Sequence, residues 1–557
     1  MSMENIITET EAMDLDTQEK QVSVHWFRHG LRLHDNPALF EASKNSILYP
    51  VFILDGETAG TMHIGYNRFK FLLECLSDLD RQLRSHGGRL FIMQGSPVTI
   101  FETLKRKLNF TKLCFEQDCE ALWRKRDKKV RKWCASNDVE VREFVSHTLW
   151  DPEIVIKTNG NVPPLTYKMY LHTVSCIGLP PRPIEDIDFT QVTFGSLPDS
   201  CRNELGLFES VPKPEQMGKY PEPDFSNPLI RWVGGETEAL IKLNERLSQE
   251  IESFKSGVYL SNQVSPDLTG PPTSQSAALK FGCLSVRRFY WSLHDHFNNI
   301  HEGRPPSHYN ITGQLIWREY FYTMSANNPF YDQMEKNPIC LNIPWVPDSD
   351  PKKVKYLNAW KNGQTGYPFI DAVMRQLRRE GWVHHVARNA VACFLTRGDL
   401  WINWEDGVQH FFYYLLDADW SVNAGNWMWV SSSAFEQLLD CTYCVCPVNF
   451  GRRLDPDGIY IKRYVPELRQ FPIEYIYEPW KAPLEIQEKA NCIISKDYPE
   501  RIVNHVQASL ANKQKMLEIR NSLLEETPHC RPADTEEVYQ FMMFPENCND
   551  HLCANIF

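Results

Sequence analysis

Val22-Ser-Val-His-Trp-Phe27 is the first of five short, mostly apolar runs, and these runs decide the fold of the N-terminal part. The other four are residues 47–53, 90–93, 112–115 and 139–144. Segments with the apolar spacing of a helix lie between them, at residues 37–43, 68–84, 98–108 and 122–134. Short strands that alternate with helices are typical of a parallel sheet with helices on both faces. The pattern predicts an α/β domain with a Rossmann-like parallel sheet over residues 22–150.

The sequence changes character after residue 150. Prolines crowd residues 151–225, which predicts a long connector over the surface. Segments with helical spacing then replace the strand pattern, so residues 226–527 are predicted to form an all-α domain. These segments are residues 236–254, 285–296, 312–326, 367–379, 385–396 and 401–416. We expect residues 1–21 to be disordered and residues 528–557 to form a tail with one short helix.

The composition argues against several classes of function. The 59 basic and 71 acidic residues give a net charge of −12, which disfavours a protein held mainly by generic attraction to phosphates. No stretch approaches the roughly 18 apolar residues of a membrane span, and the acidic start does not resemble a signal peptide. The 16 cysteines are scattered, as thiols of a reducing compartment usually are. We expect a cytoplasmic and nuclear protein, with ordinary thiols rather than a metal site at Cys441, Cys444 and Cys446.

The densest chemical segment is residues 381–433, which carries His, Arg, Asp and Asn among closely spaced tryptophans. Upstream, residues 313–319 place Gln, Trp, Arg and Glu within two helical turns, and hydroxyl residues at 273–276 precede an apolar helix. Hydroxyls and free N–H groups at the start of a helix suit a phosphate. From the residues alone two interpretations stay open. One is a planar cofactor with a phosphate tail, and the other is a set of ordinary core and capping residues.

Four ordered motifs resemble the photolyase/cryptochrome family of flavoproteins. They are Trp26-Phe-Arg-His-Gly-Leu-Arg-Leu-His-Asp-Asn-Pro37, Ile316-Trp-Arg-Glu-Tyr-Phe-Tyr322, Gly363-Gln-Thr-Gly-Tyr-Pro368 and Asp417-Ala-Asp-Trp-Ser-Val-Asn-Ala-Gly-Asn-Trp-Met-Trp429. The resemblance covers nearly the whole chain. Within the family the chain is most similar to the insect-type, light-sensing cryptochromes, through the segments Val145-Ser-His-Thr-Leu-Trp-Asp-Pro152 and Pro528-His-Cys-Arg-Pro532.

The resemblance implies one FAD in the helical domain, whereas the residues do not indicate whether an antenna chromophore is also bound. The positions that match the family's FAD contacts are Thr273, Ser274, Ser276, Gln314, Arg318, His385, Arg388, Asp417, Asp419, Asn423 and Asn426. The serines match phosphate contacts, and Gln314 and Arg318 match contacts near the phosphates and ribose. Arg388 and Asp417 match an ion pair beside the isoalloxazine ring. Asn423 falls where a residue faces flavin N5, and insect-type light sensors usually carry Cys there.

The resemblance also gives the tryptophans a function. Trp427, Trp404 and Trp345 match a relay between the flavin and the protein surface, and Trp401 matches a fourth, outer member. Photoexcited oxidised flavin is a strong oxidant, and an adjacent indole can give up one electron. Trp401 and Trp404 are three residues apart, so we expect them on one face of a helix. Burial in the core is the alternative interpretation of any single tryptophan.

The implied function is a blue-light photoreceptor rather than an enzyme. In six-four photolyases the helix that corresponds to residues 385–389 carries two histidines, but the second position here is Asn389, whose amide is not an acid. A terminal helix would place Phe541, Met542 and Met543 in the cavity as a plug that light releases. The implied partners are a circadian clock protein of the Timeless type and ubiquitin-ligase machinery, without a productive DNA substrate. A DNA photolyase and a light-independent transcriptional repressor of the clock are the alternatives.

Overall fold

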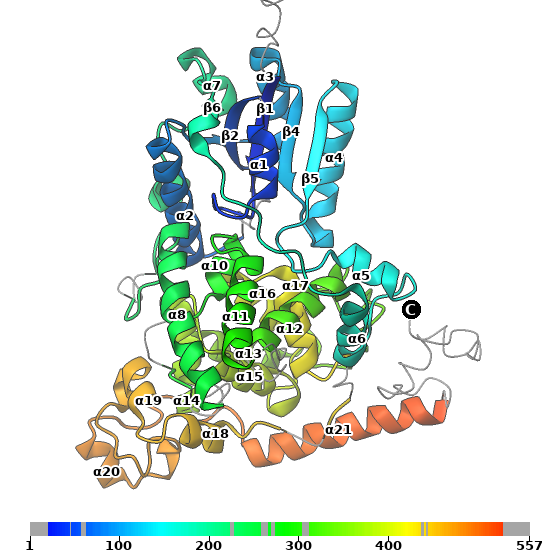
Figure 1. The fold of residues 1–557 in the computed structure, drawn as a ribbon. Helices are drawn as coiled ribbons and strands as arrows, with labels where there is room; N and C mark the ends of the chain where they lie inside the picture. Colours follow the sequence, from blue (N-terminus) through cyan, green and yellow to red (C-terminus); the bar gives the residue numbers. More distant parts are fainter. Residues whose placement is uncertain are drawn as a thin grey trace, which may run out of the picture.

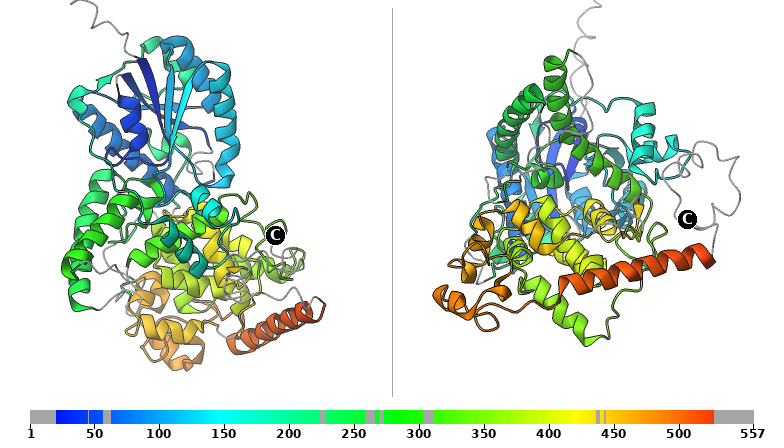
Figure 2. Two further views of the ribbon diagram at one scale, coloured as in Figure 1. Left: turned by 45° about the vertical axis from the view of Figure 1, so that its right-hand side comes forward. Right: turned by 90° about the horizontal axis from the view of Figure 1, so that it is seen from below.

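The structure is a computed structural model that describes residues 21–526, apart from residues 45, 57–62, 223–227, 258–265, 269–272, 303–310, 436–438 and 442–443. Residues 1–20 and 527–557 lie outside the described residues. The predictions for the N-terminal segment and for the tail with Phe541, Met542 and Met543 therefore fall on residues that the structure does not describe. Figure 2 shows an α/β domain stacked on a helical domain.

The α/β domain is built on a parallel sheet, as the alternation predicted. Its strands are β1 (Gln21–Phe27), β2 (Ser46–Leu54), β3 (Phe91–Gln94), β4 (Lys112–Glu116), β5 (Glu140–Phe144) and β6 (Thr193–Phe194). The strand order is β3-β2-β1-β4-β5, with the short β6 paired to β2 (Figure 1). All described pairings are parallel, and Val24 of β1 lies opposite Tyr49 of β2 and Leu113 of β4.

Helices cover both faces of this sheet because its strands are apolar on both faces. The covering helices are α1 (Pro37–Ser43), α2 (Tyr66–Ser85), α3 (Pro97–Leu108) and α4 (Arg124–Ser136). Val24 and Trp26 pack in one hydrophobic cluster with residues of α3 and α4. Phe27 packs in a second cluster with residues of α1 and α2, and this cluster continues into the helical domain. Neighbouring residues of β1 thus point to opposite faces, as the two-residue period of a strand requires.

Residues 151–225 contain more structure than their prolines suggested. They hold α5 (Pro152–Thr158), α6 (Tyr167–Ile177) and α7 (Arg202–Leu205), besides β6. The ring of Tyr167 stacks on Trp317 with centroids 3.7 Å apart, and the Tyr320 hydroxyl donates to the carbonyl oxygen of Leu165 at 2.6 Å. Pro152 occupies the first turn of α5, where the missing N–H costs nothing. These residues therefore pack on the helical domain instead of only crossing the surface.

The described residues beyond 226 form helices and one isolated bridge but no strand, which confirms the predicted all-α domain. The helices are α8 (Glu236–Ser256), α10 (Ser276–Phe281), α11 (Val286–Ile300), α12 (Ile311–Ser325), α13 (Pro351–Asn362), α14 (Pro368–Glu380), α15 (His385–Cys393), α16 (Trp404–Tyr414), α17 (Trp420–Val430), α18 (Pro447–Leu454), α19 (Ile459–Tyr464), α20 (Leu484–Lys489) and α21 (His505–Glu526). Among all described residues, none of the helices is long and apolar enough to span a membrane.

The prediction of one helix over residues 401–416 is wrong at its start. The helix begins only at Trp404, because the side chain of Asn403 accepts a hydrogen bond from the Glu405 N–H at 3.1 Å and caps it. Trp401 precedes this cap with a left-handed φ of 53°. Trp401 and Trp404 therefore do not share a helix face, and their relative placement depends on a turn instead.

The α/β domain also holds the chain around residues 412–418 in place. Arg68 of α2 is completely buried, and its guanidinium donates to the carbonyl oxygens of Phe412 at 2.7 Å and Ala418 at 2.9 Å. Hydrogen bonds from a charged group are stronger than neutral ones. This arginine thus fixes the backbone between Asp417 and Asp419, which both line the cavity described next.

Candidate functional site

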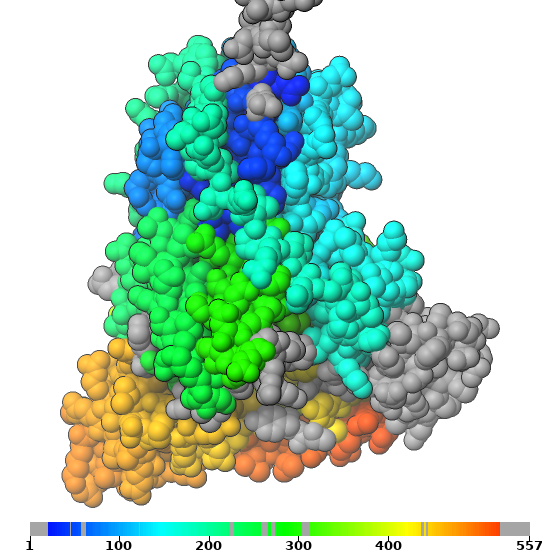
Figure 3. All heavy atoms as spheres, viewed as in Figure 1, coloured from blue at the N-terminus to red at the C-terminus, as the bar shows by residue number. Residues whose placement is uncertain are grey.

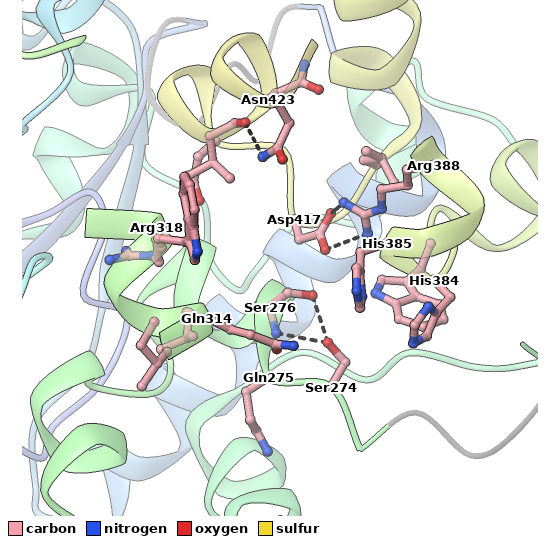
Figure 4. Close-up of a pocket in the computed structure, with 18 of the residues that line it drawn as sticks. Ser274, Gln275, Ser276, Gln314, Arg318, His384, His385, Arg388, Asp417 and Asn423 are labelled. Atoms are coloured by element: carbon pink, nitrogen blue, oxygen red, sulfur yellow. Dashed lines mark hydrogen bonds and ion pairs between the residues drawn. The ribbon is translucent and has the colours of Figure 1, made fainter. Parts of the chain in front are cut away.

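A cavity of about 880 Å³ lies within the helical domain. All eleven residues that the resemblance pointed to line it, from Thr273 to Asn426, and Asn389 and Trp427 do so as well. They come from the loop before α10 and its first residue, from α12 and α15, and from α17 and the loop before it; Figure 4 shows ten of the lining side chains labelled. The structure thus brings together residues that lie about 150 positions apart in the chain. Their contacts with a ligand stay a prediction.

Two serines at the start of α10 present their hydroxyls to the cavity. The Oγ atoms of Ser274 and Ser276 lie 3.0 Å apart, and Ser274 Oγ accepts the Ser276 backbone N–H at 3.3 Å (Figure 4). Paired hydroxyls of this kind can turn to meet the oxygens of an anion. The neighbouring Thr273 hydroxyl instead donates to Gln249 Oε1 of α8 at 3.4 Å, so its side chain ties the loop to α8.

Arg388 and Asp417 form the ion pair that the motifs indicated. Arg388 Nη1 and Nη2 donate to the two carboxylate oxygens of Asp417 at 3.0 and 2.8 Å, and Nε donates to the carbonyl oxygen of Val383 at 2.9 Å. The Asp417 side chain is only 5% exposed. A bidentate pair fixes both planes, so the guanidinium of Arg388 has a fixed orientation at the cavity wall (Figure 4).

A second ion pair at the cavity joins Asp419 to Lys280. Lys280 Nζ lies 3.0 Å from Asp419 Oδ1, and both side chains are almost completely buried. Burial alone would raise the pKa of Asp419, but the positive charges of Lys280 and Arg318 hold it below its usual value. Asp419 is therefore a carboxylate at neutral pH. Lys280 was not singled out from the sequence, although it lies four residues after Ser276 on the same helix.

Arg318 makes more contacts with protein groups than the resemblance implied. Its Nη1 donates to Glu319 Oε1 at 2.7 Å, and its Nη2 lies 3.0 Å from His147 Nε2. Only its buried Nε has no hydrogen-bond partner among the described residues. Burial raises the pKa of Glu319 to about 7 despite Arg318. Arg318 therefore links the cavity to the loop around His147, and its two Nη atoms already contact protein groups.

Two polar side chains of α17 face the cavity in different ways. Asn423 is 8% exposed, and its Nδ2 donates to the carbonyl oxygen of Val408 at 3.0 Å. This bond fixes the amide plane and leaves its oxygen and second N–H for a ligand (Figure 4). Asn426 Nδ2 donates to Val422 of its own helix at 2.8 Å, and its side chain lies at the open side of the cavity.

The two histidines at the start of α15 are held in the neutral state. The rings of His384 and His385 lie 4.5 Å apart between centroids. Burial, and then the positive charge of Arg388, lowers the pKa of His385 to about 4, and burial lowers the pKa of His384 to about 3. Both rings can therefore donate one hydrogen bond and accept another at neutral pH.

The four tryptophans of the predicted relay are all buried, and one of them, Trp427, lines the cavity. Trp427 lines it and is 2% exposed, while Trp404 is completely buried on α16, the helix that packs against α17. The rings of Trp345 and Trp401 lie 4.8 Å apart between centroids. No ring contact directly joins Trp427, Trp404 and Trp345 among those described, although Trp427 contacts Phe411 at 5.0 Å and Trp360 at 6.1 Å.

The residues around the cavity fit a large ligand with planar and anionic parts. Gln275 is 5% exposed, yet neither atom of its side-chain amide has a hydrogen-bond partner among the described residues. Such orphaned groups are costly unless a ligand or water satisfies them. The cavity volume lies within the usual range for small-molecule sites. Gln275 was missed from the sequence, because a Gln between two serines does not reveal its burial.

Among the described residues, no three His, Cys, Asp or Glu side chains are arranged to hold a metal ion.

Comparisons with known proteins agree with this site. The family described as "FAD binding domain of DNA photolyase" matches residues 311–518, and the family described as "DNA photolyase" matches residues 23–185. Cryptochrome-1 of Aedes aegypti is 54% identical over 94% of this chain and 98% of its own length. Cryptochrome-1 of Drosophila melanogaster is 53% identical over 93% of this chain and 97% of its own length. The chain belongs to the photolyase/cryptochrome family. The resemblance to insect-type cryptochromes is thereby confirmed.

Solved structures of this family have the same fold. A bacterial class III photolyase from Agrobacterium tumefaciens has a TM-score of 0.74 and 26% identity, covering 92% of this chain and all of its own. A cryptochrome from Synechocystis sp. PCC6803 has a TM-score of 0.75 at 23% identity, and the match covers 89% of this chain and 99% of that protein. The cofactor of this flavoprotein is FAD, and the cavity described above fits it.

Proposed function

We propose that this cryptochrome is a blue-light receptor in which light drives one electron along buried tryptophans toward the cavity. The observation that carries the proposal is Trp427, a buried indole in the wall of the cavity that fits FAD. Bound oxidised FAD supplies a one-electron oxidant when it absorbs blue light. The indole of Trp427 would give up this electron, because it is the tryptophan of the series that lines the cavity.

The remaining tryptophans would carry the positive charge away from the cavity. Trp404 would donate one electron to oxidised Trp427, and the Trp345–Trp401 pair would then donate one electron to oxidised Trp404. No proton has to move in these steps, since each indole passes on only an electron. The 4.8 Å separation of the Trp345 and Trp401 rings supports fast exchange within the last pair. Separation of the charges would prevent the electron from returning at once.

The polar residues of the cavity would hold the cofactor and stabilise added negative charge. The hydroxyls of Ser274 and Ser276 suit its phosphates. The Arg388–Asp417 pair would hold a guanidinium in a fixed orientation beside the ring. Asn423, fixed by Val408, can donate to or accept from a ring nitrogen. Neutral His385 would respond to a change of charge through the hydrogen bonds that its two ring nitrogens can form.

We further propose that the light signal reaches a partner through the C-terminal tail. The similarity to insect cryptochromes supports a tail helix with Phe541, Met542 and Met543 that fills the open side of the cavity until light releases it. The partners proposed are a circadian clock protein of the Timeless type and ubiquitin-ligase machinery, in the cytoplasm and the nucleus. A productive DNA substrate is not part of the proposal.

The proposal is tested by flavin photoreduction in two matched variants. Trp427→Phe should abolish fast photoreduction under blue light, because phenylalanine is far harder to oxidise than indole. Trp420→Phe is the control on the same helix, since Trp420 packs on Tyr331 and does not line the cavity. It should bleach like the unaltered protein. Unchanged bleaching in Trp427→Phe would remove Trp427 from the pathway and with it the proposed mechanism.

A further inference from the structure

The exposed side of α4 carries only positive charge. Its buried residues include Arg126, Asp127, Val130 and Cys134. Four lysines point away from them into solvent, and we call them the lysine face: Lys125, Lys128, Lys129 and Lys132. Residues spaced by three, four and seven positions share one side of a helix, so these charges follow one stripe about 10 Å long. Figures 1 and 3 show α4 at the outer edge of the α/β domain.

The lysine face has no acidic partner among the described residues, unlike the arginines beside it. Arg124 Nη2 lies 3.1 Å from Glu153 Oε1, and Arg131 Nη2 donates to Glu143 Oε2 at 2.8 Å. The one acidic residue of α4 is Asp127, which is buried and lies 2.6 Å from Arg28 Nη1. The carboxylates near α4 are therefore already paired with arginines.

Other surface helices balance their basic side chains with acidic ones. On α2, Arg84 Nε lies 2.7 Å from Asp80 Oδ2, and on α8, Lys255 Nζ lies 2.8 Å from Glu252 Oε1. Like charges three or four residues apart repel and weaken a helix. The lysine face is thus an unbalanced positive surface in a chain whose net charge is −12, and an anionic occupant would relieve its repulsion.

The N-terminal segment, residues 1–20, has the composition of such an occupant. It has one lysine, Lys20, and six acidic residues, which are Glu4, Glu9, Glu11, Asp14, Asp16 and Glu19. The acidic residues are spread over 16 positions, so that a chain laid along the stripe can present several carboxylates to it. The two charge patterns are therefore complementary.

The described fold starts close enough to α4 for this segment to reach it. Ser23 of β1 lies opposite Lys112 of β4, and Lys112 lies opposite Glu140 of β5. The start of β1 is thus two strand spacings, about 10 Å, from the start of β5, and α4 ends at Ser136, just before β5. A flexible chain of 20 residues spans about 25 Å on average. Reaching the lysine face requires no change in the fold.

We propose that residues 1–20 dock on the lysine face of α4 in the same chain, through ion pairs between their carboxylates and the lysine ammonium groups. A single exposed ion pair is weak and is screened by salt. Several pairs act together here, and the direct link to β1 keeps the segment at a high effective concentration near the face. The docked segment shields the lysine face from other polyanions.

The first test is the rate at which the lysine amines are acetylated by the neutral N-hydroxysuccinimide ester of acetic acid, read by mass spectrometry. At about 0.02 M salt, the lysine face should react about threefold more slowly in the unaltered protein than in a chain that begins at Gln21. That chain lacks no described residue. A second variant keeps all 20 residues but replaces the six acidic ones by Gln or Asn, and it should react like the shortened chain.

The matched controls are Lys352 and Lys355, which are exposed on α13 in the helical domain. Their rates should be the same in all three proteins, and the protection of the lysine face should disappear at about 0.5 M salt. Equal rates for the lysine face in the unaltered and shortened chains would overturn the proposal. Full protection in the variant without the six acidic residues would overturn the ionic contact.

The second test identifies the occupant. A carbodiimide joins a carboxylate to an amine that it contacts, without adding atoms between them. The main products on the lysine face should join it to residues 1–20 of the same chain, as a mixture of isotope-labelled and unlabelled protein can show. Products that join it instead to residues 527–557, to another copy of the chain, or to no segment more often than Lys352 and Lys355 would each overturn the proposal.

Discussion

Gly407 of α16 lies directly against the indole of Trp427. A Cβ atom at position 407 would lie 2.2 Å from Cη2 and 2.4 Å from Cζ3 of this ring, closer than any real contact. Glycine inside a helix costs about 1 kcal/mol relative to alanine. Its presence here lets the two helices approach until the Trp427 ring covers the backbone of α16, the helix that begins with Trp404.

Gly407→Ala should therefore move Trp427. We expect a net loss of about 1–3 kcal/mol of unfolding free energy from overpacking, despite the better helix propensity of alanine. Flavin photoreduction should slow, because the indole leaves its position in the cavity wall. Urea unfolding and the photoreduction rate measure the two effects. A variant that is more stable and equally fast would show that the ring is not held by this contact.

The Arg388–Asp417 pair should stabilise the protein even without cofactor. Arg388→Ala leaves the carboxylate of Asp417 buried without its partner, and we expect a loss of about 1–3 kcal/mol in urea unfolding of the flavin-free protein. Arg378→Ala is the control, because its partner Glu222, 2.6 Å away, is 33% exposed whereas Asp417 is 5% exposed, so the loss should be less than about 1 kcal/mol. Equal losses in both variants would contradict the special position of Arg388.

His384 should make the protein less stable in acid. Its Nδ1 accepts the Val386 N–H at 3.3 Å and caps α15, and its pKa is lowered to about 3. The unfolded chain therefore binds the proton first, so this contribution is complete above about pH 6.5 and is lost as pH falls toward 3. Between pH 7 and pH 5 the loss is about 2 kcal/mol.

His384→Asn keeps a capping side chain but does not titrate. The difference in unfolding free energy between this variant and the unaltered protein should change by about 2 kcal/mol from pH 7 to pH 5. Urea unfolding at both pH values measures it. A difference that stays constant over this range would mean that His384 is not neutral in the folded protein.

The protein should not repair ultraviolet lesions in DNA. His385 and Asn389 lie one helical turn apart and both line the cavity, but the amide of Asn389 cannot act as an acid. Incubation with irradiated oligonucleotides under blue light should leave six-four lesions unchanged. Cyclobutane dimers tested in parallel should also persist. Reversal of either lesion at useful rates would favour a photolyase instead.

Removal of the tail should make partner binding independent of light. A chain that ends at residue 527 lacks the segment with Phe541, Met542 and Met543, so nothing remains to be released. Binding to a Timeless-type protein in darkness should then equal binding in blue light, and the full-length chain is the control. Strictly light-gated binding by the shortened chain would refute the proposed plug.

Retention of flavin on purification would speak against a light-independent repressor.

The sequence predicted the elements whose periodicity and end signals agree. Residues 37–43 were predicted as a helix and form α1 with the same bounds, because Pro37 starts it and Asn36 caps it. The start of α16 was missed although Asn403 is a good capping residue, since the apolar pattern continues through Trp401. The helix α5 was missed because Pro152 was interpreted as part of a connector.

The candidate site was predictable where its residues stand in long motifs. Arg388 and Asp417 could be named from the sequence, and they do meet in the structure. The contact of Arg318 with His147 could not be predicted, because these residues are 171 positions apart and meet only through the packing of the folded chain.

Transient absorption of the purified protein after a blue flash tests the central claim most directly. If FAD occupies the cavity beside Trp427, oxidised-flavin absorbance should fall as the absorbance of an oxidised tryptophan rises, without an added reductant. Protein that purifies without flavin, or that holds flavin but shows no tryptophan signal after the flash, would contradict the account.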